Sequence, residues 1–251
     1  NFEYELNKIF FKDFKLRKPD YSFNDKDISI KKIAYNLINF DKICKIEKPD
    51  ALVLLGDTNS ALSAYCAKRN KIPIFHLEAG NRSFDQRVPE EINRKIIDHI
   101  SDYNLVYTDI AKAYLLKEGI LGEKIIKVGS PMLEIFNKNL TQIKKNKILF
   151  DLNIKKKKYF LVSFHREENL ENINNLRKFT ELLNQLSKKY SYPLIVTTHY
   201  KLKDRLSKNN FKINKNVKFF KPFGFIDYSS LQLNSFLTMS DSGSIVEDSS
   251  I

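Results

Sequence analysis

The stretch at residues 75–94 concentrates ionisable side chains beside an apolar run. Carboxylates and imidazoles can transfer protons, and arginines can bind anions or orient carboxylates. A soluble loop does not require so many charges next to a buried strand, so the stretch indicates a catalytic or binding site. Its ionisable residues are His76, Glu78, Arg82, Asp85, Arg87, Glu90, Glu91 and Arg94.

A second informative stretch, "SDSGSIVED" at 240–248, places small residues where a predicted strand turns into a helix. Ser242, Gly243 and Ser244 would leave backbone N–H groups open at a helix N-terminus, which favours an anion such as a pyrophosphate. Glu247 or Asp248, one turn later, could hold a ribose hydroxyl pair. A Ser/Gly helix cap is also common without any ligand, and neither a Walker A nor a G-x-G-x-x-G pattern is present.

Short apolar runs alternate with amphipathic segments along the chain. This alternation predicts parallel sheets built from right-handed strand–helix–strand crossovers. In the helix expected at 89–102, Ile92, Ile96 and Ile100 recur at i, i+4 and i+8, with Ile97 beside them, and predict its buried face. We expect strands at 51–56, 72–78, 103–109, 124–131, 159–165, 193–199, 216–222 and 236–244, and helices at 59–70, 89–102, 110–119, 170–190, 200–209 and 227–235.

A polar, lysine-rich stretch at about 141–158 separates two such series. We therefore expect an α/β protein with two doubly wound, Rossmann-like domains facing a cleft. The expected domains are residues 1–147 and residues 148–251. The chain lacks an initiator methionine and ends without a closing element, so we expect both domains to be truncated.

In open parallel sheets, ligands bind outside the carboxyl ends of the strands. Asp57, Glu78, His165 and the 240–244 segment all fall at such ends. Each has an ordinary explanation when taken alone, because an Asp after a strand is often a turn residue and acidic residues suit the first turn of a helix. Their joint position at the edges of two sheets favours a catalytic cleft.

Composition excludes several classes of protein. The formal net charge is +13, but lysines and acidic residues are interleaved along the whole chain, which argues against a nucleic-acid groove. Cys44 and Cys66 have no disulfide or zinc spacing, which fits a reducing cytoplasm. No apolar run reaches the roughly 18 residues of a membrane helix. We expect no nucleic-acid partner, no membrane partner and no metal.

Five ordered motifs resemble the non-hydrolysing UDP-N-acetylglucosamine 2-epimerases. "GDTNS" (56–60) is similar to the GDT motif of that family, "HLEAGNRS" (76–83) to H-x-E-A-G-x-R, and "PEEINR" (89–94) to PEE-x-N-R. "SFHREEN" (163–169) resembles HR-x-EN, and "SDSGSIVED" (240–248) resembles DSGG-x-x-EE. Within the family, the segments "NRSFDQR" and "VGSPMLEIF" resemble the branch that makes UDP-N-acetyl-L-fucosamine for capsule or O-antigen polysaccharides.

The resemblance implies the glycosyltransferase-B-like arrangement of two domains and a cytoplasmic homodimer acting on a UDP-sugar. It also implies epimerisation at C2 by elimination and re-addition of UDP, without nicotinamide or any other cofactor. The matching positions make Asp57, Glu78, Glu90 and His165 the catalytic candidates. The substrate-binding candidates are Arg82, Glu91, Arg94, Arg166, Ser242, Gly243, Ser244, Glu247 and Asp248, of which Arg82, Glu91 and Arg94 would also order the loop and orient the carboxylates.

The chain departs from the family pattern at several positions. Tyr200 stands where the family has His-Pro, Ser244 replaces the second glycine of the phosphate loop, and Asp248 replaces a glutamate. Alternatives are the general UDP-N-acetylglucosamine 2-epimerase that forms UDP-N-acetylmannosamine, a glycosyltransferase of the same architecture, and a non-catalytic nucleotide-binding protein.

Overall fold

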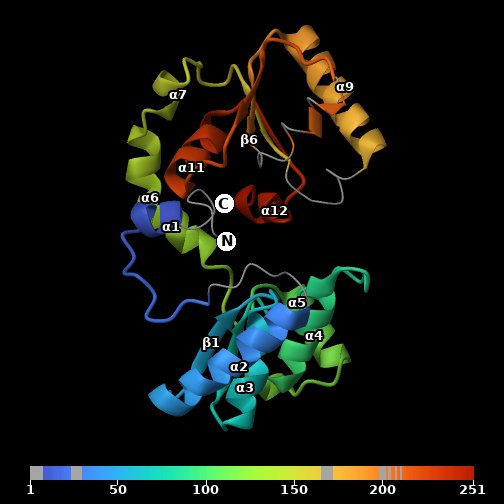
Figure 1. Ribbon diagram of the computed structural model, residues 1–251. Coiled ribbons are helices and arrows are strands. Elements are labelled where there is room, and N and C mark those ends of the chain that lie inside the picture. Colours follow the sequence, from blue (N-terminus) through green and yellow to red (C-terminus); the bar gives the residue numbers. More distant parts are fainter. Residues whose placement is uncertain are drawn as a thin grey trace. The chain divides into compact units, whose positions relative to one another are not determined.

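The computed structural model describes residues 8–23, 30–164, 172–197, 202, 205, 206, 208, 209 and 211–251 (Figure 1). The chain divides into two compact units. We call Pro19–Pro131 the central unit. The terminal unit comprises the described part of Asn1–Lys18 together with Met132–Ile251. None of the described helices is long and apolar enough to cross a membrane.

The central unit contains a four-stranded parallel sheet in the order β1-β2-β3-β4. Its strands are β1 (Leu52–Leu55), β2 (Ile74–Leu77), β3 (Tyr103–Val106) and β4 (Ile125–Lys127). Its helices are α2 (Ile30–Glu47), η2 (Ala61–Ser63), α3 (Ala64–Arg69), α4 (Pro89–Ile100), α5 (Asp109–Lys117) and η3 (Gly122–Lys124).

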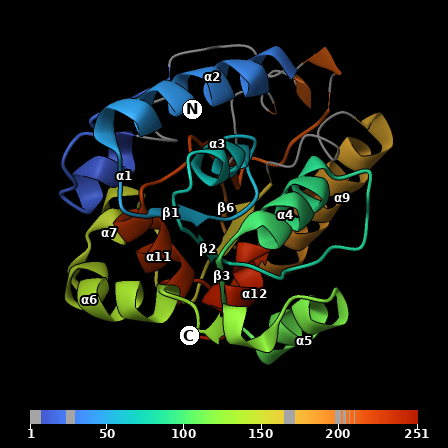
Figure 2. The same cartoon turned by 90° about the horizontal axis from the view of Figure 1, so that it is seen from below.

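Helices α3 and α4 lie against one face of the central sheet (Figure 2). Ala64 and Ala67 of α3 are fully buried there, and their small side chains let the helix approach Ile74 of β2 closely. Val53 and Leu55 point to the opposite face of the sheet and remain 62% and 55% exposed. The core of this unit therefore lies on the side of the sheet that carries α3 and α4.

The buried face of α4 differs from the predicted one. Ile92 and Ile96 are 48% and 45% exposed, whereas Ile97 is completely buried. The helix turns polar residues inward instead, because Glu91, Asn93, Arg94 and Asp98 are all less than 9% exposed. Of the predicted apolar positions, Ile97 and Ile100 pack in the core and Ile92 and Ile96 do not, and polar side chains make up the rest of the inward face.

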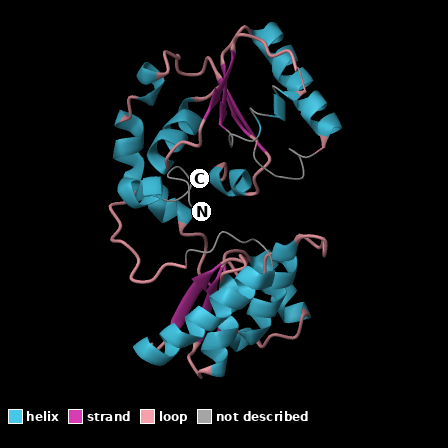
Figure 3. Ribbon diagram, viewed as in Figure 1, coloured by secondary structure: helices cyan, strands magenta, loops and turns pink. Residues whose placement is uncertain are grey.

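The terminal unit contains a second four-stranded parallel sheet in the order β7-β6-β5-β8 (Figure 3). Its strands are β5 (Phe160–Ser163), β6 (Leu194–Thr197), β7 (Val217–Phe220) and β8 (Leu237–Ser240). Helix α9 (Ile173–Tyr190) covers one face with Leu176 and Leu183, and α11 (Phe225–Asn234) covers the other with Leu231. The predicted α/β fold with two parallel sheets is confirmed.

The division between the units lies earlier than the predicted boundary at 147/148. Helix α6 (Met132–Lys145) belongs to the terminal unit because Phe136 packs on Phe225 of α11, with ring centroids 5.2 Å apart. Helix α1 (Lys8–Asp13) also packs on α11 and so belongs to the terminal unit, although it lies near the start of the chain. The remaining described helices of this unit are α7 (Ile148–Asp151) and α12 (Ser244–Asp248).

Candidate active site

Two turns at the carboxyl edge of the central sheet present acidic side chains. Gly56 follows β1 with φ +74°, and Glu78 follows β2 with φ +63°. The left-handed region is uncommon for a residue other than glycine, and occupying it costs of order 1 kcal/mol or more. The Gly56 amide donates to the Leu77 carbonyl at 3.1 Å, which holds the two turns side by side. Asp57 and Glu78 are thereby brought to one edge of the sheet.

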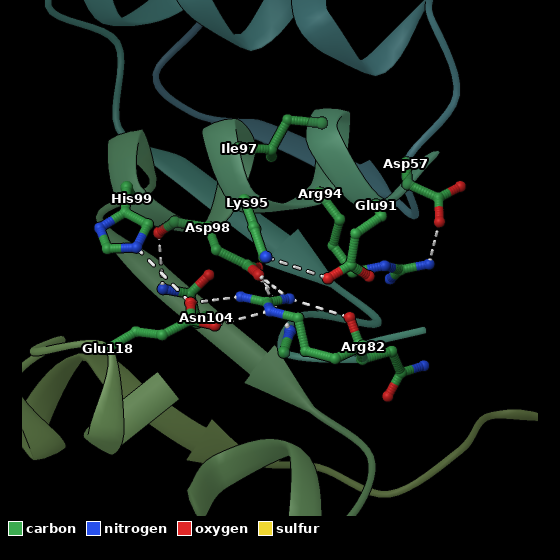
Figure 4. Close-up of polar contacts among 12 residues, drawn as sticks. Asp57, Arg82, Glu91, Arg94, Lys95, Ile97, Asp98, His99, Asn104 and Glu118 are labelled. Atoms are coloured by element: carbon green, nitrogen blue, oxygen red, sulfur yellow. Dashed lines mark hydrogen bonds and ion pairs between the residues drawn. The ribbon is translucent and has the colours of Figure 1, made fainter. Parts of the chain in front are cut away.

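A single arginine from α4 joins these two carboxylates. Arg94 donates to Asp57 Oδ2, to Glu78 Oε1 at 2.8 Å and to the Glu78 carbonyl. Its side chain is 7% exposed, whereas the side chains of Asp57 and Glu78 are 21% and 30% exposed. Figure 4 shows Arg94 directed toward Asp57. The arginine therefore binds both carboxylates from the protein side and leaves each of them partly exposed to solvent.

The residue before Arg94 anchors the first of the two turns. Asn93 donates through Nδ2 to the Asp57 carbonyl at 2.9 Å and to Asn59 Oδ1 at 3.0 Å. Sequence reasoning did not select Asn93, although its place in the "PEEINR" segment was a usable signal. Adjacent residues of α4 thus fix the backbone and the side chain of Asp57.

Glu91 is committed to the loop that precedes α4. Its Oε2 accepts the Ser83 amide at 2.7 Å and the Ser83 hydroxyl at 3.2 Å, and its Oε1 lies 3.2 Å from Lys95 Nζ. Burial raises the pKa of Glu91, but the contacts with Ser83 and Lys95 outweigh it, so the net pKa is lowered. The geometry favours loop ordering over substrate contact.

Glu90, the neighbour of Glu91 in the first turn of α4, is exposed. It borders a pocket of about 220 Å³ that also reaches Asp57 and Arg94. The structure therefore brings five of the predicted residues to one cavity. The pocket is lined by Asp57, Asn81, Arg82, Ser83, Val88, Glu90, Glu91 and Arg94.

Arg82 does not turn its charge toward this pocket. Its side chain is completely buried; Nε and Nη2 donate to Glu118 at 2.8 and 2.6 Å, and Nη1 lies 2.7 Å from Asp98 Oδ2. Figure 4 shows the guanidinium of Arg82 between these two carboxylates. The predicted direct substrate contact is therefore not what the geometry offers, and Arg82 orders the loop from inside.

Asp98 and His76 complete a buried set that sequence reasoning missed. Both oxygens of Asp98 lie 3.3 Å from the Gly80 amide, and Oδ1 lies 2.9 Å from His76 Nδ1 at an angle outside that of a hydrogen bond. His76 Nε2 lies 2.9 Å from the Gly56 carbonyl. The polar stripe Glu91, Arg94, Asp98 at helical spacing was the available signal.

Tight packing fixes the loop at Gly80. Its φ is +76°, and a Cβ at this position would lie 2.6 Å from the Ala111 carbonyl oxygen. Only glycine fits both the dihedral angle and the close approach to α5. The path of the chain from Glu78 to Arg82 is therefore set by α5 as well as by Asp98.

The terminal unit carries the second predicted motif at the carboxyl end of β8. The Ser242 amide donates to Ser240 Oγ at 3.0 Å, and a Cβ at Gly243 would meet no atom within 4 Å. The chain then enters α12 at Ser244. This turn has open space beside its backbone, as an anion-binding loop requires. His165 and Arg166 lie outside the described residues.

Asp248 lies at the end of α12 in mostly apolar surroundings, while Glu247, beside it, is half-buried. Burial raises the pKa of Asp248, and its Oδ2 lies 3.5 Å from Gln232 Nε2. It borders a pocket of about 480 Å³. That pocket is lined by Phe136, Asn137, Leu140, Ile143, Ser229, Gln232, Leu233, Thr238, Ile245, Asp248, Ser249 and Ile251.

Comparison with known proteins identifies relatives across the chain. The model of the family described as UDP-N-acetylglucosamine 2-epimerase matches residues 1–251. A UDP-N-acetylglucosamine 2-epimerase of Methanocaldococcus jannaschii is 36% identical over 255 residues, which cover 98% of this chain and 70% of the relative. A UDP-2,3-diacetamido-2,3-dideoxy-D-glucuronate 2-epimerase of Pseudomonas aeruginosa is 28% identical, over 99% of this chain and 69% of the relative.

Solved structures agree with these matches. The structure of UDP-N-acetylglucosamine 2-epimerase from Rickettsia bellii superposes with a TM-score of 0.89 at 46% identity, covering 100% of this chain and 67% of that one. The M. jannaschii enzyme in complex with UDP-GlcNAc and UDP also gives a TM-score of 0.89, at 36% identity, covering 99% of this chain and 70% of that one. The chain therefore belongs to the UDP-N-acetylglucosamine 2-epimerase family, and it is an isomerase that acts on a UDP-sugar.

Proposed function

We propose that the chain inverts C2 of a UDP-linked 2-acetamido sugar by eliminating UDP and adding it back. The proton on C2 is not adjacent to a carbonyl and is barely acidic, so direct removal is unfavourable. In the proposed elimination, a carboxylate takes the C2 proton while the C1–O bond to UDP breaks, which leaves a C1=C2 double bond. Re-addition returns UDP to C1 and a proton to the opposite face of C2.

The observation that carries this proposal is the pairing of Asp57 and Glu78 on Arg94, with Glu90 at the same pocket. A reaction that removes a proton from one face and returns it to the other needs more than one acid–base group. Arg94 reduces the repulsion between the two carboxylates and so can keep them at short range. We assign Asp57, Glu78 and Glu90 as the candidate acid–base groups, with His165 as a candidate to assist the departure of UDP.

We further propose that the terminal unit holds the UDP moiety. The turn at Ser242, Gly243 and Ser244 has open space at Gly243 for a pyrophosphate, although the Ser242 amide donates to Ser240 Oγ, and Arg166 is an additional candidate contact. Asp248 or Glu247 would accept the ribose hydroxyls. Burial of Asp248 supports a contact that is completed by a ligand, because its Gln232 contact is long.

The test is solvent deuterium incorporation at C2, followed by NMR, in the variants Glu78→Gln and Glu90→Gln. Each variant should lose about 10²- to 10⁴-fold in exchange rate, while UDP binding measured by calorimetry persists. Glu123→Gln is the matched control, because Glu123 is an exposed carboxylate of η3 in the same unit. Exchange at the wild-type rate in both Glu78→Gln and Glu90→Gln would contradict the assignment of these carboxylates as acid–base groups.

For the sugar, we propose UDP-2-acetamido-2,6-dideoxy-L-talose, with UDP-N-acetyl-L-fucosamine as the product for a surface polysaccharide. The segment "NRSFDQR" supports this choice, since Asn81 and Ser83 border the pocket beside Glu90. The names of the relatives favour UDP-N-acetylglucosamine as the alternative. Offering each UDP-sugar alone decides between them, and formation of an epimer without any acceptor also excludes a glycosyltransferase. The homodimer stays a prediction that the mass in solution would check.

A further inference from the structure

A buried ionic set lies directly beneath the proposed acid–base groups. Asp98 is 1% exposed and the side chain of Arg82 is completely buried, with Glu118 beyond it at 26% exposure. A buried carboxylate is costly unless a positive group and hydrogen bonds satisfy it. Arg82 and the Gly80 amide supply both to Asp98. The set is therefore able to persist as a rigid frame inside the unit.

This frame reaches the first acidic turn through His76. The ring is completely buried, with Nδ1 2.9 Å from Asp98 and Nε2 2.9 Å from the Gly56 carbonyl. A carbonyl oxygen can only accept, so Nε2 must carry the proton that it donates. The peptide that receives this bond is the one that leads into Asp57. His76 therefore holds the peptide that leads into Asp57 by a hydrogen bond, and its ring packs directly against the buried Asp98 without a hydrogen bond between the two side chains.

The frame reaches the second acidic turn through the Gly80 amide, two residues after Glu78. Gly56, Glu78 and Gly80 all have positive φ values, so neither turn is held by regular secondary structure. Backbone conformations of this kind persist only where the surroundings over-determine them. Arg94 joins the two turns at their exposed side, through Asp57 and Glu78, and Asp98 contacts them from the buried side, through His76 and the Gly80 amide.

We propose that Asp98 and His76 are positioning residues that hold the turns of Asp57 and Glu78 in register for proton transfer at C2. This inference rests on the proposed function of those carboxylates. Neither Asp98 nor His76 touches substrate, because both side chains are fully buried. A displacement of about 1 Å in a reacting group can cost about 10²-fold in rate, so loss of the frame should lower kcat rather than raise KM.

Two substitutions of His76 separate its two contacts. In His76→Gln the amide nitrogen reaches about as far as Nε2 and can still donate to the Gly56 carbonyl. In His76→Asn the side chain is too short to reach the Gly56 carbonyl, and its amide occupies only the position of Nδ1 beside Asp98. We expect His76→Gln to keep kcat within a few-fold of wild type and His76→Asn to lose about 10²-fold, with KM for the UDP-sugar within about two-fold in both.

Asp98→Asn should also lose about 10²-fold in kcat, because it weakens both branches of the frame. Asp102→Asn is the matched control. Like Asp98, Asp102 accepts a backbone amide, but that of Ile74 at 2.9 Å, at the start of β2 and away from the two acidic turns. It should leave kcat unchanged. Wild-type kcat in His76→Asn, or equal losses in His76→Gln and His76→Asn, would overturn the positioning role.

A measurement that does not depend on catalysis, the hydrogen exchange of the Gly80 amide, separates this inference from the proposed function. Hydrogen exchange should show a protected Gly80 amide in the wild type and in His76→Gln, and a faster-exchanging amide in Asp98→Asn. Absence of deuterium incorporation in the wild-type enzyme would count against the proposed reaction alone. Unchanged Gly80 protection in Asp98→Asn would overturn the frame whatever the reaction is.

Discussion

Arg82 and Arg94 belong to one short stretch of sequence, yet their surroundings differ sharply. Arg94 faces Asp57 and Glu78, whose side chains are 21% and 30% exposed. Arg82 faces Asp98, which is completely buried, and Glu118 at 26%. In the first cluster Asp57 borders a pocket, whereas the second cluster keeps Asp98 entirely inside the protein.

The same pairing of arginine and carboxylate therefore serves two purposes. Breaking a buried cluster costs much free energy, because it leaves a charge without a partner where water cannot solvate it. Such a cluster is therefore rigid. A cluster at a pocket can exchange partners and protons with solvent or ligand. The contrast predicts that damage to the inner cluster appears first in stability, whereas damage to the outer cluster appears first in catalysis.

The sharpest test of the contrast is Arg82→Met. It leaves Asp98 and Glu118 without their guanidinium, and we expect a loss of roughly 3–5 kcal/mol in the free energy of unfolding. Urea denaturation monitored by circular dichroism measures it. Arg87→Met is the control, because Arg87 is 90% exposed and pairs only with the neighbouring Asp85 at the surface. Equal stability of the two variants would mean that burial does not distinguish the clusters.

A second test concerns the loop that links the clusters. Gly80→Ala adds a Cβ that would lie 2.6 Å from the Ala111 carbonyl oxygen, at a φ of +76°. We expect a loss of about 2–4 kcal/mol in the free energy of unfolding. Gly129→Ala has nearly the same φ, +75°, but nothing within 4 Å, and should lose only about 1 kcal/mol. Equal losses would show that packing against α5 does not constrain the loop.

The smallest expected effect is a change in pH dependence. The bond from Arg82 is the main cause that holds the pKa of Glu118 below its ordinary value. A lowered folded pKa contributes stability above the unfolded pKa of about 4.3, and this contribution is lost as pH falls through the folded pKa. Glu118→Gln should therefore flatten the fall in unfolding free energy below about pH 4.3. Parallel curves for wild type and Glu118→Gln would contradict the pairing.

Much of the architecture was predictable from the sequence. Buried strands such as β6, with all four residues buried, read as apolar runs, and the carboxyl-edge rule selected Asp57, Glu78 and the 240–244 turn. The rule works because parallel strands expose their last residues at one edge regardless of the details of packing. The family assignment followed from motifs at these same edges.

Side-chain direction was not predictable in the same way. Arg82 and Arg94 look equivalent in the sequence, and only the fold decides which of them is enclosed. The apolar stripe on α4 was right for Ile97 and Ile100 and wrong for Ile92 and Ile96, which remain half-exposed because the helix also buries charged side chains. The expected boundary at 147/148 was placed in the polar segment 141–158, whose first residues form the last turn of α6, a helix that packs on Phe225 of the terminal unit. Helix α2 was not predicted at all.

Glu78 has a consequence that reaches beyond the site. Its φ of +63° is one that glycine adopts without steric cost and that glutamate does not. Folding alone would prefer glycine at this turn, whereas the proposed reaction needs a carboxylate there. One residue is therefore subject to opposite demands, and the stability of the enzyme is expected to trade against its activity at this position.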